Sequence, residues 1–465
     1  MTSKALTPLA LALALAAAGC ASLEPALPQA QPDVPAQWPI PDRTGDVALA
    51  AVADIGWRDF FVDDDLEALI ARALENNRDL RVAVLNVERA RSLYRVQRAA
   101  RLPSVGGAVD MTRTGGGDAP DTESYSASVG VAGFELDLFG RVKSLGDAAL
   151  REYFATEEAR RAAQLSLVAE VAGAYLTLAA DRELVRVALA ALDNREKWFG
   201  LTQKRFDLGA VSRLDLAQAR TLVETARADA ARYEGQVARD INALALLVGA
   251  PVEDSLLPQR FDESVSGLDP VPAGLPSEVL LRRPDVLQAE QRLRAANANI
   301  GAARAAFFPS IRLTGAVGTA SDELSGLFSG GSFAWSFLPR IDVPIFQGGR
   351  LIANLGVSKA DRDIALASYE KSIQSGFREV ADALASSRAL APQRAALEAQ
   401  VAAATQAEEL SRARYDAGAD SFLALLDAQR TLYSAQQALV ATRLAEQSNR
   451  VTLYRVLGGG WKERT

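Results

Sequence analysis

Hydrophobic residues in the first part of the chain follow two different periods. Between residues 64 and about 101 they recur every three or four positions, which is the spacing of one face of an α-helix. The first such positions are Leu66, Leu69, Ile70 and Leu74. Pro103 ends the predicted helix because proline lacks the backbone N–H that the next turn needs. After Pro103 the period changes to two, which predicts β-strands.

Four segments show this alternation: residues 104–112, 124–131, 310–317 and 332–337. In each segment one face carries apolar residues and the other carries mostly small or polar ones. The apolar sets are Val105, Val109 and Met111; Tyr125, Ala127, Val129 and Val131; Ile311, Leu313 and Val317; and Phe333, Trp335 and Phe337. Strands of about ten residues with one apolar face are typical of a transmembrane β-barrel. A soluble hairpin with one buried face has the same period and is the alternative interpretation.

A very long helical segment follows each pair of predicted strands, over residues 142–206 and 351–415, with Pro392 as the only internal proline. About sixty helical residues extend for roughly 90 Å, which few globular cores require. Gly209 and Gly418, which suit a left-handed helix cap, end the two segments. The predicted return helices cover residues 212–247 and 421–457.

The two halves also repeat individual residues in the same order. Asn77-Arg78-Asp79 is matched by Arg283-Pro284-Asp285, 206 residues later. Two further matches lie 209 residues apart: Arg205-Phe206-Asp207-Leu208-Gly209 with Arg414-Tyr415-Asp416-Ala417-Gly418, and Leu247-Val248-Gly249 with Val456-Leu457-Gly458. Preserved order and a nearly constant offset indicate an internal duplication, with a period far too long for a solenoid.

The N-terminus has the composition of a bacterial lipoprotein signal. Lys4 precedes an apolar stretch rich in alanine and leucine, and small residues lead up to Cys20, the only cysteine in the chain. Residues 1–19 are therefore predicted to be a signal peptide, with Cys20 acylated after cleavage. An ordinary signal peptide with an incidental cysteine is the alternative. Ala21, in the position where aspartate would direct a lipoprotein to the inner membrane, favours sorting to the outer membrane. The sequence after the signal contains no run of eighteen apolar residues, so we predict no transmembrane helix.

The predicted signal peptide and the internal duplication together determine the predicted domain organisation. Residues 20–60 are expected to form the lipid anchor and a proline-rich, extended tether. Residues 61–250 form the first repeat and residues 276–459 the second. Residues 251–275 are an irregular linker between the repeats, and residues 460–465 are a tail.

Two predicted strands in each half give four strands per chain. Bacterial barrels made of a single chain begin at about eight strands. Four strands in a membrane would leave two unpaired edges, and each unpaired backbone group in hydrocarbon costs several kcal/mol. If these strands cross a membrane, the protein must therefore form an oligomer that pairs the edges.

Composition removes most kinds of enzyme. The 465 residues include no histidine, which is the commonest general base and metal ligand. A single cysteine forms neither a disulfide framework nor a thiolate metal cluster. The formal net charge of -7 argues against a nucleic-acid partner. We therefore expect no enzyme; a hydrolytic lipoprotein is a distant alternative.

Longer motifs carry a resemblance to a known family. They are Arg283-Pro284-Asp285-Val286, Ala295-Ala296-Asn297-Ala298-Asn299-Ile300-Gly301, Phe308-Pro309-Ser310, Glu135-Leu136-Asp137-Leu138-Phe139-Gly140-Arg141 and Leu426-Asp427-Ala428-Gln429-Arg430-Thr431-Leu432. In the order in which they occur along the chain, these motifs resemble the outer-membrane efflux channel family (TolC/OprM-like), most closely its NodT-type outer-membrane lipoprotein subgroup. The resemblance covers about residues 36 to 459.

The resemblance implies a mixed α/β membrane protein that is mostly α. Four transmembrane strands per chain would complete a twelve-stranded β-barrel in a homotrimer, and a long α-helical barrel with an equatorial region would lie in the periplasm. Its implied function is the passive exit duct of a tripartite efflux pump for drugs or other small molecules, with no cofactor. The implied partners are a periplasmic adaptor (membrane fusion protein), an inner-membrane transporter that is usually proton-driven in NodT-type relatives, and outer-membrane lipid. A lipid-anchored periplasmic scaffold or adaptor without a pore is the alternative.

The resemblance also assigns roles to residues at the helix tips, where the family closes its duct. By position, Asp420 is similar to a constriction aspartate, Asp427 to a helix aspartate near the pore, and Asp215 to an acidic tip residue. Tyr415 matches a tyrosine with gate-holding contacts. A ring of aspartates would concentrate negative potential and select cations. Helix capping is the alternative role for the aspartates.

The residues at the two tips are further expected to dock the adaptor. Glycine there would let an adaptor hairpin approach the backbone closely. The predicted docking residues are Gly209, Ala210, Val211, Gly418 and Ala419.

Overall fold

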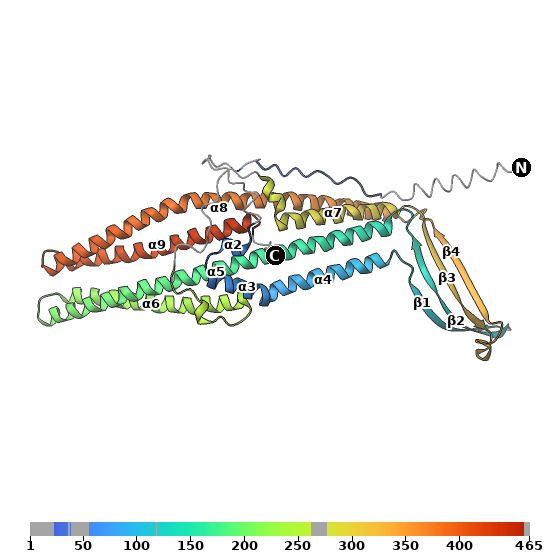
Figure 1. Ribbon diagram of the computed structural model, residues 1–465, viewed down its shortest axis with the longest axis horizontal. Coiled ribbons are helices and arrows are strands. Elements are labelled where there is room, and N and C mark those ends of the chain that lie inside the picture. Colours follow the sequence, from blue (N-terminus) through green and yellow to red (C-terminus); the bar gives the residue numbers. More distant parts are fainter. Residues whose placement is uncertain (1–22, 36–37, 39–54, 118, 262–276, 460–465) are drawn as a thin grey trace. The chain divides into compact units, whose positions relative to one another are not determined.

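The computed structural model describes residues 23–35, 38, 55–117, 119–261 and 277–459 (Figure 1). The described chain is mostly helical, with one four-stranded sheet. Its helices are α2 (Trp57–Phe60), α3 (Asp64–Asn76), α4 (Arg78–Ala99), α5 (Arg141–Asp207), α6 (Arg213–Val248), α7 (Pro284–Ala305), α8 (Arg350–Asp416) and α9 (Phe422–Val456). Its strands are β1 (Val105–Gly116), β2 (Ala119–Leu136), β3 (Ser310–Ser321) and β4 (Phe333–Asp342). The predicted signal peptide, Cys20 and the tail at 460–465 lie outside the described residues.

The chain divides into two compact units. One contains the sheet, within residues 85–158 and 287–371. The other contains residues 32–84, 159–286 and 372–465. Each unit therefore combines segments from both halves of the sequence.

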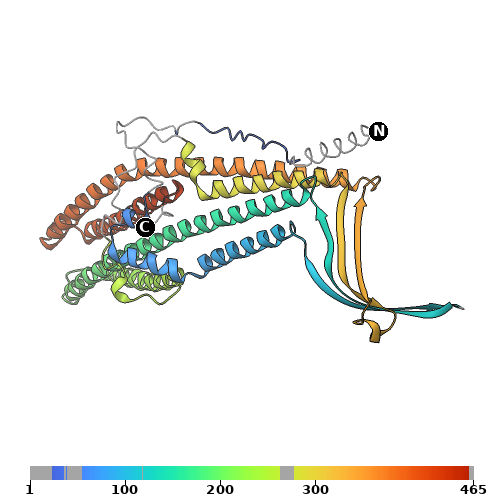
Figure 2. The same ribbon diagram turned by 45° about the vertical axis from the view of Figure 1, so that its right-hand side comes forward.

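The sheet joins strands from the two halves of the sequence. All neighbouring strands are antiparallel, in the order β1-β2-β3-β4 (Figure 2). The central pair, β2 and β3, brings a strand of the first repeat against a strand of the second, with Val129 opposite Val317. The outer strands β1 and β4 are the two edges of the sheet.

The register places the predicted apolar residues together on one face. Met111 lies opposite Tyr125, and Val317 lies opposite both Val129 and Trp335. Paired residues of an antiparallel sheet point to the same side, so the four apolar sets form one surface. The small and polar residues between them share the other face. The predicted alternation is confirmed in all four strands.

The apolar face of the sheet is exposed in a single chain. Val109 is 79% exposed, Phe333 69% and Trp335 72%. A soluble hairpin with a buried face would have covered these side chains. A large exposed apolar surface marks a membrane or a partner contact.

The strands extend further than the alternating segments predicted, and β2 shows why. A bulge between Val131 and Phe134 inserts one extra residue opposite β3, and Gly133 in the bulge has a φ of 64°. The extra residue keeps Val131 and Phe134 on the same face although they are three residues apart. Strict alternation therefore stops at Val131, while the strand continues to Leu136.

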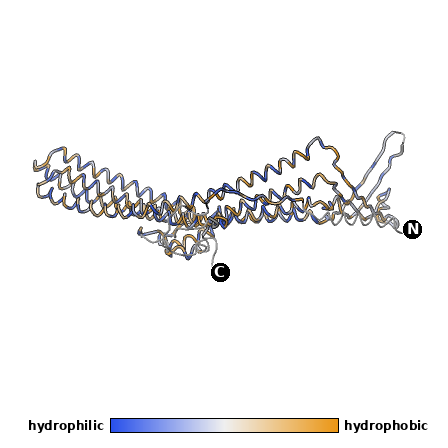
Figure 3. The backbone as a smooth tube through the Cα atoms, turned by 90° about the horizontal axis from the view of Figure 1, so that it is seen from above, coloured by the Kyte–Doolittle hydropathy of each residue, from blue (hydrophilic) through white to orange (hydrophobic). Residues whose placement is uncertain are grey.

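The long helices α5 and α8 contain 67 residues each, a length of roughly 100 Å. Their ends lie within one residue of the predicted segments, and α8 includes Pro392 without interruption. By length and composition alone, α5 could cross a membrane, but half of its apolar window is buried in the structure. Val168, Val171 and Leu176 belong to the core, which explains that apolar content. Figure 3 shows hydrophobic and hydrophilic positions interspersed along the helices.

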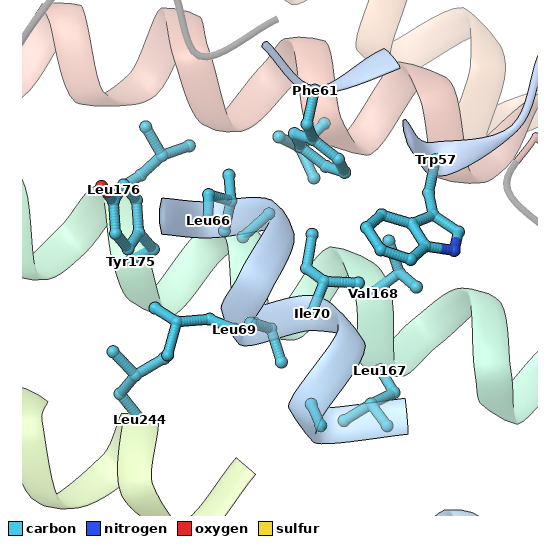
Figure 4. Packing of buried hydrophobic residues seen from close by; sticks show 14 of the residues in the cluster. Trp57, Phe61, Leu66, Leu69, Ile70, Leu167, Val168, Tyr175, Leu176 and Leu244 are labelled. Carbon is cyan, nitrogen blue, oxygen red and sulfur yellow. The ribbon is translucent and has the colours of Figure 1, made fainter. Parts of the chain in front are cut away.

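The main core of the second unit forms where α3 packs against α5 and α6. Figure 4 shows Leu66, Leu69 and Ile70 of α3 among apolar side chains of these helices, including Leu176 and Leu244. All five residues are fully buried. The apolar spacing that predicted the first helix is therefore the spacing of its core face.

This core begins earlier than the predicted start of the first repeat at residue 61. Trp57 is fully buried and Phe60 is 3% exposed, and Phe60 stacks on Tyr454 with 3.9 Å between ring centroids. Residues 57–60 therefore belong to the packed body and not to the tether. Hydrophobic periodicity did not reveal them because α2 has only one turn.

The helix predicted over residues 64 to 101 is in fact two helices, α3 and α4. The chain is extended at Asn77, with a ψ of 130°. The Asn77 side chain accepts a hydrogen bond from the Leu80 amide at 2.9 Å, which caps α4 in the manner of a helix N-cap. The prediction of one helix was wrong because asparagine interrupts the backbone without disturbing the hydrophobic period.

The same position forms a joint in both repeats. Asn77 donates through Nδ2 to the Leu247 carbonyl at 2.8 Å, and Arg283 donates through Nη1 to the Val456 carbonyl at 2.8 Å. The duplication pairs Asn77 with Arg283 and Leu247 with Val456. Each repeat therefore fastens its first helix to the end of its last helix through equivalent positions.

Candidate functional site

The turn between α5 and α6 is held by backbone hydrogen bonds. Gly209 has a φ of 76°, its N–H donates to the Phe206 carbonyl at 2.8 Å, and the Ala210 N–H donates to the Arg205 carbonyl at 2.8 Å. These two bonds form a Schellman motif, in which a left-handed residue closes the helix. A side chain at Gly209 would be strained by this φ, which explains the glycine.

Asp215 takes part in the start of α6. The Asp215 N–H donates to Ser212 Oγ at 3.1 Å, and Asp215 Oδ2 accepts from the Ser212 N–H at 3.0 Å. This reciprocal arrangement is the capping box that the sequence allowed as an alternative. A role of Asp215 in a gate stays a prediction.

The turn between α8 and α9 has the same backbone bonds. Gly418 has a φ of 73°, and its N–H donates to the Tyr415 carbonyl at 3.0 Å. The Ala419 N–H donates to the Arg414 carbonyl at 2.8 Å, which completes a second Schellman motif. The duplication has therefore preserved the tip geometry as well as the helices.

Asp420 has a different partner from Asp215. Its carboxylate receives two hydrogen bonds from Arg414, from Nε at 2.6 Å and from Nη2 at 2.9 Å. These hydrogen bonds hold the pKa of Asp420 below its usual value. Helix α9 begins after Ser421, so Asp420 does not cap it. The capping alternative for Asp420 is therefore wrong.

Asp427 lies within α9 and its side chain is exposed. Its backbone carbonyl accepts a hydrogen bond from Thr431 at 2.9 Å, which is a bond within the helix. Because Asp427 lies beyond the first turn, it does not cap α9 either. A role of Asp427 in a gate stays a prediction.

Tyr415 is buried in an apolar cluster between the two helical hairpins. The centroid of its ring lies 6.0 Å from the centroid of the Trp198 ring and 5.4 Å from that of the Phe422 ring. Leu222 of α6 and Leu425 of α9 belong to the same cluster. Tyr415 therefore contributes its ring to the contact that holds the α5–α6 hairpin against the α8–α9 hairpin.

Arg205 adds a charged contact beside this cluster. Its guanidinium lies 5.0 Å from the centre of the Tyr415 ring, and its Nη2 is 3.8 Å from Asp416 Oδ1. A cation over an aromatic ring and a partly exposed ion pair each contribute modestly, at most about 1 kcal/mol. The tips are thus joined within one chain by an apolar cluster with one ion pair at its edge.

The predicted docking residues lie on the surface of both tips. Gly209, Ala210, Gly418 and Ala419 are exposed, and Val211 is half-buried. Three large apolar side chains close to them are exposed too: Leu208 at 84%, Leu214 at 66% and Leu423 at 61%.

Comparisons with known proteins identify the family. The sequence matches the family described as Outer membrane efflux protein over residues 69–250 and 275–459. The antibiotic efflux pump outer membrane protein ArpC of Pseudomonas putida is 46% identical over 461 residues, covering 96% of this chain and 94% of ArpC. This chain belongs to the outer membrane efflux protein family.

Further relatives agree with this assignment. Outer membrane protein OprJ of Pseudomonas aeruginosa is 46% identical, covering 89% of this chain and 88% of OprJ. The open state of the MtrE outer membrane channel of Neisseria gonorrhoeae superposes with a TM-score of 0.87 at 40% identity, covering 95% of this chain and 99% of MtrE. The protein is therefore an outer-membrane efflux channel, and the family is one of transport channels, not of enzymes. The alternative of a scaffold without a pore does not fit these relatives.

Within this family assignment, the sequence had not indicated Arg414, Arg205 or Trp198 as tip residues. The repeated Arg205–Gly209 and Arg414–Gly418 motifs carried a usable signal, because an arginine occurs at the same place in both. Their different partners could not be read from the sequence. Those partners, Asp420 and Asp416, depend on how the turn and the two hairpins fold.

Proposed function

We propose that three copies of this chain form the exit duct of a tripartite efflux pump, which passively conducts drugs or other small molecules from the periplasm to the exterior. The observation that carries this proposal is the four-stranded sheet, with one exposed apolar face and edges at β1 and β4. Such a sheet needs lipid on its apolar face and further strands at both edges.

Three copies satisfy both requirements. Pairing β4 of one protomer with β1 of the next would give twelve strands, within the range of closed bacterial barrels. Closure removes the unpaired backbone groups, each of which costs several kcal/mol in hydrocarbon. The apolar face would then meet lipid, and the face with Ser126, Ser128 and Thr314 would line a water-filled interior.

The helix tips are proposed as the gate. Asp420 and Asp427, together with Asp215, would place acidic groups where the duct narrows, and Tyr415 would keep the two hairpins of each protomer together. The ion pair with Arg414 holds Asp420 in place and partly offsets its charge. The exposed Asp427 would then contribute the less compensated negative charge, which favours cations in the resting duct.

The exposed tip surface is proposed as the docking site of the periplasmic adaptor. Leu208, Leu214 and Leu423 offer apolar contacts beside backbone that glycine leaves open. The adaptor would connect the duct to an inner-membrane transporter, which we propose to be proton-driven. Acylated Cys20 would add a lipid anchor in the outer membrane.

Mass measurement of the detergent-purified protein tests the trimer. Three chains in each particle, in a complex that resists mild denaturation, are expected. A uniform population of folded single chains would contradict the proposal, because one chain leaves both edges of its sheet without a partner.

A further inference from the structure

The described N-terminal residues are not a free tether. Residues 23–35 form neither helix nor strand, with Asp33 at a φ of 47°, and follow two helices of the second repeat, first α7 and then α8. We define residues 23–35 as the strap. Its contacts are specific hydrogen bonds, which a flexible linker would not need.

Helix α7 holds the beginning of the strap through one stripe of side chains. Asn297 donates through Nδ2 to Glu24 Oε1 at 2.9 Å and to the Pro25 carbonyl at 2.8 Å. Arg304 donates through Nη1 to the Leu23 carbonyl at 3.1 Å. Asn297 is only 1% exposed, so the strap and its neighbours cover it almost completely.

Gly301, between these two residues on the same stripe, makes room for the strap. A Cβ atom at this position would lie 3.1 Å from the Glu24 nitrogen and 3.2 Å from its Cα, and 2.8 Å from Ser144 Oγ. Glycine destabilises the interior of a helix relative to alanine, so its presence here needs a reason. Close approach of the strap and of α5 supplies that reason.

Helix α8 continues the contact with a second stripe. The Gln31 N–H donates to Glu370 Oε1 at 2.9 Å, and Gln374 donates through Nε2 to the Pro32 carbonyl at 2.8 Å. Glu370 and Gln374 are four residues apart and lie on one face of the helix. The strap contains Pro25, Pro28, Pro32 and Pro35, and prolines stiffen an extended chain before it binds.

The first repeat lacks this stripe. The positions 206 residues before Asn297, Gly301 and Arg304 are Arg91, Arg95 and Arg98 on α4. All three arginines are exposed. The second repeat therefore carries an amide, a glycine and an arginine that contact the strap. The first repeat carries three exposed arginines at the equivalent positions.

We propose that the stripe of Asn297, Gly301 and Arg304 is a binding site for the chain's own N-terminal segment, and that it fixes where the lipid anchor is attached to the body. This inference rests on the proposed acylation of Cys20. Three residues of extended chain span at most about 11 Å, so Cys20 is tied closely to Leu23. Arg304, which holds Leu23, is in the last turn of α7, just before β3 begins at Ser310.

Hydrogen exchange of the strap in the full mature protein tests this site. Asn297→Asp replaces the donor by a carboxylate facing Glu24 and the Pro25 carbonyl, and should speed exchange of residues 23–31 roughly tenfold. Adding Glu24→Gln restores a donor and should recover part of the protection. The matched control is Asn299→Asp, the same change at an exposed position of α7, which should leave exchange unchanged.

Equal exchange in wild type, Asn297→Asp and Asn299→Asp would overturn the binding site. A general rise over the whole protein would mean that Asn297 serves the fold and not the strap, which also contradicts the proposal. Conductance of the wild type is recorded separately. If the wild type conducts but Asn297→Asp does not change exchange of the strap, the strap site is rejected and the duct is retained. If the wild type does not conduct, the duct is rejected and the strap site is judged by hydrogen exchange alone.

Discussion

At the scale of residues, duplication has given equivalent side chains different partners. Arg205 and Arg414 each lie two residues before the end of a long helix, and the backbone carbonyl of each accepts the closing hydrogen bond of its turn. The Arg414 side chain holds Asp420 within its own turn. The Arg205 side chain instead reaches Asp416 of the other hairpin. One arginine shapes a tip and the other joins the two tips.

The capping role of Asp215 predicts a local loss of stability. Asp215→Ala removes the carboxylate that accepts from the Ser212 N–H and hydroxyl, and should cost about 1 kcal/mol at the start of α6. The control is Asp427→Ala, the same change at an exposed position inside α9. Hydrogen exchange of the first turn of α6 checks this, and equal protection in both variants would show that the box contributes nothing.

A pair of aspartates, the half-buried Asp181 and the buried Asp240, predicts how stability depends on pH. Burial, then a hydrogen bond with Asp240, raises the pKa of Asp181 to about 7. In the unfolded chain an aspartate titrates near pH 3.9. Between these values the folded state binds a proton that the unfolded state releases, so stability falls as pH rises through about 7.

Asp181→Asn should remove this dependence because asparagine resembles the protonated aspartate. Its melting temperature should exceed that of the wild type at pH 8, and the two should agree at pH 4. Asp193→Asn, at an exposed ion pair with Lys197 on the same helix, is the control. If the melting temperatures of Asp181→Asn and the wild type differed by the same amount at pH 4 and pH 8, the proton would not belong to this pair.

At the scale of elements, the joint at Arg283 predicts a large effect. Its side chain is 8% exposed and bonds to Asp285, Glu379 and the Val456 carbonyl. Arg283→Met would leave these groups without their cation, at a cost of about 3 kcal/mol. Arg292→Met, at an exposed position of α7, should change little. Chemical denaturation compares the two variants, and similar midpoints would show that the joint is not needed.

The two faces of the sheet make a second prediction at this scale. Val109→Lys places a charge on the apolar face, where it costs about 2–4 kcal/mol in the middle of the membrane, and should reduce insertion into lipid vesicles. Ala108→Lys adds the same charge on the opposite face and should insert normally. Equal insertion of both variants would mean that the apolar face does not meet lipid.

Much of this architecture could be predicted from the sequence because long regular elements repeat one period many times. The faces of the strands and the ends of α5 and α8 followed from apolar spacing and from Gly209 and Gly418. Three features could not be predicted in this way. The break at Asn77 leaves the hydrophobic period unchanged, the one-turn helix at Trp57 is too short to show a period, and the Arg414–Asp420 pair depends on the shape of a turn.

At the scale of the whole molecule, the proposed assembly would affect both the edges of the sheet and the helix tips. The edges at β1 and β4 need neighbouring chains, and neighbouring chains would bring the tips of several protomers together. In the proposed trimer, a group such as Asp420 would act as part of a ring, so its effect on ion flow would exceed its effect on the stability of one chain. The duct therefore has to be tested by its conductance.

The most direct test is the single-channel conductance of the mature protein in a planar bilayer, with wild type beside Asp420→Ala. We predict small, cation-selective openings in the wild type, and larger and less selective ones in the variant, because the variant frees Arg414 and loosens the tip. Asp147→Ala, which breaks an exposed ion pair with Arg101 at the start of α5, should behave as the wild type. Folded protein that gives no openings in any of the three forms would contradict the duct, and an unchanged Asp420→Ala would contradict the gate.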